Sequence, residues 1–225
     1  TRGGTEDLTV NLNTDGNYNV YSYVWIDWNQ DGDFDDLNET YDMGLTNNNP
    51  DGPTSNSPLA IAIPEDALLG DTRMRVWSQY YSGLVPPSNP CGNSTDGEIE
   101  DYTVTVVEST DYTYNEGWTP ANPNGVSTSG DAINITSGNA MIDSDTTIKT
   151  MTVTPTGSLT VNSGVTLTVV DTLTLESHSN NFACLMRNGT INGALRYERY
   201  TNQISSGSTG GNDLITPPLN GQRFD

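Results

Sequence analysis

Apolar and polar residues alternate along most of this chain with the period of two that is typical of β-strands. In the first half the alternating stretches are residues 8–12, 18–28, 59–63, 72–81 and 102–106. Turn-forming sequences such as Asn13-Thr-Asp-Gly16 separate them, and the composition includes 22 Gly and 12 Pro. Helical periodicity is absent from the sequence around the strands. The pattern therefore predicts an all-β fold, in which a first domain covers residues 1–108.

The second half shows a different pattern, with brief runs of Ile, Val, Leu and Thr separated by Gly, Asn or Asp. These runs are residues 132–135, 148–153, 158–161, 165–169, 172–175 and 194–197. Short, evenly spaced strands predict a β-solenoid over residues 131–200, in which apolar side chains stack as internal ladders. A small β-sandwich of hairpins is the alternative, because similar strand spacing would serve it. We expect residues 109–130 to be a linker and residues 201–225 to be a tail leading into a further segment.

The strand over residues 18–28 leads directly into a carboxylate-rich turn. Oxygen-bearing side chains occupy every second position there: Asp27, Asn29, Asp31, Asp33 and Asp35. Gly32 holds the sixth place, so the turn matches the opening of a calcium loop. The twelfth place holds Asn38 and not the glutamate of a helical calcium site, and Glu39 follows. A polar turn without metal is the alternative reading, because Asp, Asn and Gly also favour turns. The spacing favours calcium on a β-scaffold.

A second acidic group, Glu98, Glu100 and Asp101, precedes the strand that ends at Val106. We expect either this group or Glu39 to complete the calcium shell. Glu98 and Glu100 could also form an acid/base pair, because alternate residues of a strand share a face about 7 Å apart. A nearby cation would however keep both ionised, whereas a general acid must hold a proton. With one histidine and no nucleophile motif, the sequence does not indicate an enzyme.

Several separated blocks of the first half resemble the GEVED domain of secreted and cell-surface bacterial proteins, especially those of Bacteroidota. The blocks are residues 25–36, 63–76, 90–92 and 97–102, with Ile99 in place of the valine of the family's name. The resemblance implies a non-catalytic, calcium-stabilised β-sandwich, usually in proteins exported by the type IX secretion route. It also implies that Cys91 pairs with an upstream cysteine that this chain lacks. Residues 131–200 resemble the Thr/Val/Gly-rich stalks of large bacterial surface proteins.

Charge narrows the classes of partner. The chain has 29 Asp and Glu against 8 Lys and Arg, a formal net charge of −21 and a pI of about 4.1. This field repels nucleic acid and attracts divalent cations. Apolar runs are too short for membrane insertion. We expect an extracellular or cell-surface protein, in which Cys91 and Cys184 lie in different domains and have structural roles.

Two functions agree with these observations. The first is a non-catalytic, calcium-stabilised module of a large secreted or cell-surface protein, acting as an adhesin or structural element. The second is an accessory carbohydrate-binding module of a secreted enzyme. Trp77, Tyr80 and Tyr81 could form a sugar-stacking platform, although cross-strand packing is the favoured role of such aromatics. The expected partners are a divalent cation, flanking domains of a longer polypeptide, and a surface glycan or protein ligand.

Overall fold

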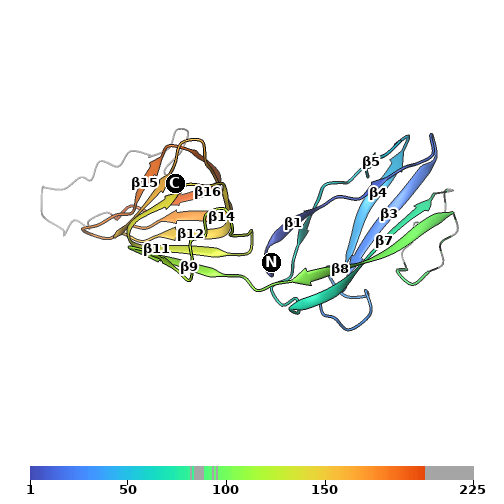
Figure 1. Ribbon diagram of the computed structural model, residues 1–225, viewed down its shortest axis with the longest axis horizontal. Coiled ribbons are helices and arrows are strands. Elements are labelled where there is room, and N and C mark those ends of the chain that lie inside the picture. The colour runs from blue at the N-terminus through green and yellow to red at the C-terminus, as the bar shows by residue number, and fades with distance from the viewer. Residues whose placement is uncertain (82, 84–88, 93, 95, 201–225) are drawn as a thin grey trace, which may run out of the picture. The chain divides into compact units, whose positions relative to one another are not determined.

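A computed structural model describes residues 1–81, 83, 89–92, 94 and 96–200 of the chain (Figure 1). The chain divides into two compact units, Thr1–Ser109 and Thr110–Asp225. Within the described residues all regular secondary structure is β. No helix among them could cross a membrane. The all-β expectation is therefore confirmed.

The first unit is a sandwich of two antiparallel layers. One layer has the strand order β4-β3-β7-β8, formed by β3 (Asn19–Ile26), β4 (Thr40–Asn47), β7 (Gly70–Tyr80) and β8 (Gly97–Val106). The other layer contains two short pairs: β1 (Thr5–Leu8) with β6 (Leu59–Ala62), and β2 (Asn11–Leu12) with β5 (Gly52–Pro53). Val24, Ile26 and Met43 of the first layer pack against Ile61 of the second. This core joins the two layers.

The opposite face of β3 carries a row of aromatic side chains. The ring centroids of Tyr23 and Trp25 lie 5.6 Å apart, and those of Trp25 and Trp77 lie 6.3 Å apart. Phe34, from the loop after β3, completes this second cluster, in which Trp77 is 3% exposed. Trp77 therefore belongs to the interior. Tyr80, at the end of β7, remains 41% exposed. The loop that carries the acidic residues is thus fixed to the sheet through Phe34.

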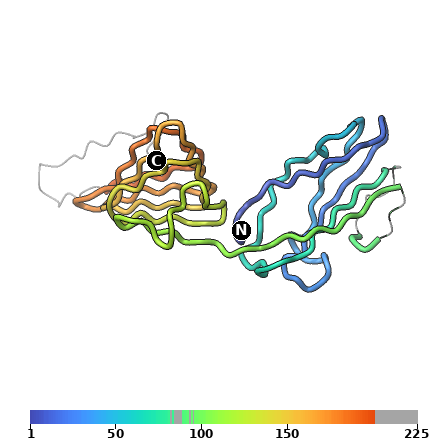
Figure 2. Tube along the Cα trace, in the orientation of Figure 1, coloured from blue at the N-terminus to red at the C-terminus, as the bar shows by residue number. Residues whose placement is uncertain are grey.

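The second unit is a β-solenoid of about four turns (Figure 2). Its strands are β9 (Asp111–Asn115), β10 (Trp118–Thr119), β11 (Ala132–Ile142), β12 (Thr146–Val153), β13 (Gly157–Val161), β14 (Thr166–Leu175), β15 (Cys184–Arg187) and β16 (Thr190–Tyr197). From β9 through β11, β12 and β14 to β16, neighbouring strands pair in parallel. A small sandwich of hairpins would require antiparallel pairs, so the solenoid prediction is confirmed.

The solenoid interior is built from ladders of equivalent residues. One ladder aligns Tyr112, Ile133, Met151, Leu173 and Leu195 on successive strands. Ile133, Met151 and Leu173 are at most 2% exposed. Such parallel stacking lets each turn cover the apolar residues of its neighbour.

The segment expected to be a linker forms part of the solenoid. Residues 111–115 form β9, which pairs in parallel with β11, and β10 pairs antiparallel with β9. Asp131 also holds this segment, because its carboxylate accepts hydrogen bonds from the backbone N–H groups of Thr110 and Thr128. The composition of residues 109–130 resembled a linker, but Tyr112 and Tyr114 supply the first rung of the internal ladders. The expected tail, residues 201–225, lies outside the described residues.

Candidate metal site

The acidic loop connects β3 to β4, and Asp27 is its first residue. The Asp27 side chain is 6% exposed, and its two carboxylate oxygens accept the N–H groups of Asp31 and Gly32 at 3.2 and 3.1 Å. Gly32 has a φ of +96°, a conformation that side chains rarely allow. Asp27 therefore closes the turn from within, and Gly32 permits its sharp bend.

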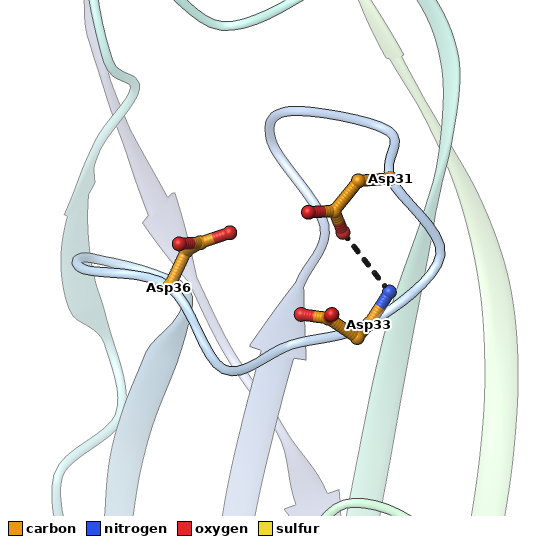
Figure 3. Close-up of side chains that lie close together, drawn as sticks. All are labelled: Asp31, Asp33 and Asp36. Atoms are coloured by element: carbon orange, nitrogen blue, oxygen red, sulfur yellow. Dashed lines mark hydrogen bonds between the residues drawn. The ribbon is translucent and has the colours of Figure 1, made fainter.

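Three exposed carboxylates converge across this loop: those of Asp31, Asp33 and Asp36 (Figure 3). One oxygen from each lies within 4.8 Å of the others. The backbone N–H of Asp33 donates to Asp31 at 3.1 Å, which fixes their relative position. Like charges at this distance repel each other, so the arrangement favours a cation between them. Oxygen ligands of this kind suit a hard cation such as Ca²⁺.

Asn29 lies beside the three carboxylates. Its Nδ2 donates hydrogen bonds to Asp31 at 3.0 Å and to Asp36 at 2.7 Å. Its Oδ1 accepts the backbone N–H of Asp31 at 3.2 Å. The amide thus places its positive end between two carboxylates from opposite sides of the loop. A cation would satisfy the same oxygens with a full charge.

Glu39 lies at the other end of the loop and is 1% exposed. Its Oε1 accepts the backbone N–H of Trp28 at 2.8 Å, whereas no hydrogen-bond partner reaches Oε2 within the described part of the chain. Burial raises the pKa of Glu39, although the hydrogen bond from Trp28 opposes this effect. The Trp28 contact ties the two ends of the loop together, and Glu39 does not join the group of three carboxylates.

The structure brings together only part of the predicted ligand set. Asp31 and Asp33 lie in the converging group with Asn29 beside them, and Asp27 supports the turn. Asp36 joins the group, whereas Asp35 does not. The sequence pattern predicts every second residue of the loop as a ligand and therefore selects Asp35. The adjacent pair of carboxylates was the only signal in the sequence that could have indicated Asp36.

The second acidic group is divided between two surfaces. Glu98 and Glu100 line a cleft between the two layers of the sandwich, while Asp101 lines a shallow pocket with Asp27 and Asp31. Arg75 donates to both oxygens of Asp101 at 2.6 and 2.7 Å, and these hydrogen bonds hold the pKa of Asp101 below its usual range. The structure therefore does not bring Glu98 and Glu100 to the acidic loop. Asp101 is already engaged by a cationic side chain.

Both cysteines are free thiols and exposed: Cys91 in the first unit and Cys184 in the second. This placement agrees with the expectation that the two cysteines lie in different domains. Cys91 lies next to Gly92, which approaches the Trp77 ring so closely that a Cβ there would lie 2.7 Å from it. This close approach gives the segment a packing role.

The first unit is thus an antiparallel β-sandwich that carries an acidic loop on one of its central strands. Residues 21–105, which lie within the first unit, match the family model of the GEVED domain. The match extends from β3 to β8 and includes the whole acidic loop. No curated protein and no solved structure matches the chain.

Proposed function

We propose that the acidic loop binds one Ca²⁺ and that the ion stiffens the GEVED domain. The observation that carries this proposal is the convergence of Asp31, Asp33 and Asp36 within 4.8 Å. These residues, with Asn29, would hold the ion, which prefers six to eight oxygen ligands. The group contains neither histidine nor cysteine, so its chemistry favours calcium over zinc or copper.

The ion would act by linkage. A cation that binds only the folded loop stabilises the fold by about 2.7 kcal/mol at a hundredfold excess over its dissociation constant. The gain is confined to the first unit, because the converging carboxylates belong to the loop between β3 and β4. Phe34 connects the loop to the sheet, because it packs with Trp25 and Trp77. An ordered loop would therefore also stabilise the sheet.

The larger role that we propose is a non-catalytic adhesive or structural module of a secreted or cell-surface bacterial protein. The GEVED match, the net charge of −21 and the solenoid support this role, because a solenoid is an extended spacer whose turns contact mainly their neighbours. Support for an accessory carbohydrate-binding module is weaker. Trp77, the largest of the three aromatics considered for sugar stacking, is 3% exposed.

Isothermal titration of the full chain with CaCl₂ tests the metal assignment. Asp31→Asn removes one converging carboxylate but keeps an acceptor oxygen for the Asp33 N–H. We expect this variant to bind Ca²⁺ at least about tenfold more weakly, because ligand charge sets the affinity of such loops. Asp171→Asn, an exposed change of equal charge in the solenoid, is the control. Equal affinity in wild type and Asp31→Asn would refute the assignment.

A further inference from the structure

A cleft of about 830 Å³ opens between the layers of the first unit, on the side where β8 ends the sheet. Its walls come from residues 8–13 in one layer and from β7 and β8 in the other. Phe34 of the acidic loop packs in the aromatic cluster with Trp25 and Trp77, whereas the cleft walls include Met74 and Val76 of the inter-layer core. The cleft is therefore separate from the candidate calcium site.

The strand that borders the cleft has one unpaired edge among the described residues. β8 pairs with β7 only. The N–H of Tyr80 donates to the carbonyl of Asp96, so the alternation of antiparallel bonding directs the backbone groups of even-numbered residues of β8 toward β7. The backbone N–H and C=O groups of the odd-numbered residues point away from β7, toward the free edge. These residues are Ile99, Asp101, Thr103 and Thr105. This edge is roughly 20 Å long at the rise of an antiparallel strand.

The free edge is closed at one end by the chain itself. The backbone N–H of Arg2 donates to the carbonyl of Val107 at 2.9 Å, in the next outward-facing position after Thr105. The Arg2 guanidinium also pairs with Glu108 at 2.6 Å. A basic residue from the N-terminal turn therefore already occupies the position that follows the free edge. The same chemistry remains available along the rest of β8.

The lining of the cleft combines apolar side chains with negative charge. The apolar lining residues are Leu8, Val10, Met74 and Val76, and the carboxylates are those of Asp96, Glu98 and Glu100. No lysine or arginine is among the described lining residues. Lysine and arginine side chains match such a surface, because their long stems cover apolar groups while their charged ends reach carboxylates.

We propose that the cleft and the free edge of β8 form a docking site for an extended basic segment of a partner protein. The segment adds to the sheet as a strand beside β8, and its Lys or Arg side chains enter the cleft opposite Glu98 and Glu100. Strand addition gives affinity through backbone hydrogen bonds, and the side chains that enter the cleft give specificity. The acidic row also disfavours pairing with β8 of a second copy, because like charges on neighbouring strands repel.

Fluorescence anisotropy with labelled ten-residue peptides provides the test, using the full chain in saturating CaCl₂ and physiological NaCl. The probe alternates Thr and Arg, and a second peptide has the same composition in two blocks. We expect the alternating peptide to bind and the block peptide to bind at least about tenfold more weakly, because only alternation presents one basic face to the cleft. Equal binding of both peptides would show general charge attraction and overturn the proposal.

Matched variants locate the site. The double variant Glu98→Gln and Glu100→Gln should weaken binding of the alternating peptide by about tenfold, as expected for two partly desolvated charge pairs. Its control is Glu116→Gln with Asp171→Asn, which removes two exposed charges from the solenoid. Equal weakening by both pairs would contradict the location.

Amide hydrogen exchange measured by NMR distinguishes strand addition from simple occupation of the cleft. The peptide should slow exchange at Ile99, Asp101, Thr103 and Thr105, whose N–H groups face outward, with little change at the even-numbered residues that already bond to β7. Unchanged exchange at these outward amides would overturn the proposal. If cellohexaose slows amide exchange in the residues that line the cleft and the alternating peptide does not bind, the site belongs to a glycan instead.

Discussion

Asp33→Asn is expected to have opposite effects on stability with and without calcium. Asp33 is one of three carboxylates that lie within 4.8 Å of one another, and its Oδ1 accepts the N–H of Asp35 at 3.0 Å. Asparagine keeps that acceptor and removes the charge. Without calcium, the substitution relieves repulsion with Asp31 and Asp36. With calcium, it removes a charged ligand.

The magnitude follows from Coulomb's law. Two unit charges 4.8 Å apart repel by about 0.9 kcal/mol at the dielectric constant of water. A Debye length of about 8 Å at physiological salt reduces this to about 0.5 kcal/mol for each pair. Asp33 takes part in two pairs, so its neutralisation should stabilise the calcium-free first unit by about 1 kcal/mol. This corresponds to a rise in Tm of about 4 to 8 °C for a domain of this size.

Differential scanning calorimetry in chelator and in excess CaCl₂ measures both effects. The Asp33→Asn variant should melt higher than wild type in chelator and lower in calcium, and about 1 M NaCl should remove most of its advantage in chelator. Asp35→Asn is the matched control, because Asp35 is a neighbouring exposed carboxylate outside the converging group. A shift of the same sign in both solutions, or an equal shift in the control, would refute the reasoning.

Three further predictions concern groups outside the converging carboxylates. Asp101→Asn should cost about 0.5 to 1 kcal/mol at neutral pH, since the pair with Arg75 is partly exposed. Because the folded-state pKa of Asp101 is lowered, this loss should vanish in urea denaturation as the pH falls below about 4. Burial raises the folded-state pKa of Glu39, so the ionised carboxylate costs stability once the pH rises through that value. Glu39→Gln should therefore stabilise the chelated protein at neutral pH and have little effect in acid. Destabilisation there in thermal melts would contradict this account. Met151→Ala should cost the solenoid about 2 to 5 kcal/mol in urea denaturation, whereas Met141→Ala, at a side chain 48% exposed, should cost little; equal costs would contradict the ladder.

Much of the solenoid could be predicted because its rungs are local repeats. Runs such as residues 172–175 place apolar and Thr side chains on alternate sides, and stacking repeats the same environment. The sequence did not predict the first rung, which is formed by β9. Tyr112 and Tyr114 lie in a short polar stretch, and only their parallel pairing with Ile133 and Ile135 of β11 identifies them as part of the ladder.

The candidate site could be predicted as a loop but not in its ligand geometry. The spacing of Asp27, Gly32 and the acidic residues indicated the turn, and the structure brings Asp31 and Asp33 together. Gln30 and Asn38 have φ values of +56° and +68°, so the backbone reverses within the loop and strict alternation of side chains ends. This geometry depends on burial of Glu39 and Phe34, which the local spacing does not encode.

Hydrogen exchange of the full chain, measured by mass spectrometry in CaCl₂ and in chelator, tests most directly whether calcium organises the first unit. Removal of calcium should increase exchange in residues 27–39 and in the adjoining strands β3 and β4. Residues 132–175 of the solenoid should exchange at the same rate in both solutions, because their ladders contain no converging carboxylates among the described residues. Unchanged exchange in residues 27–39, or earlier opening of the solenoid, would contradict the account.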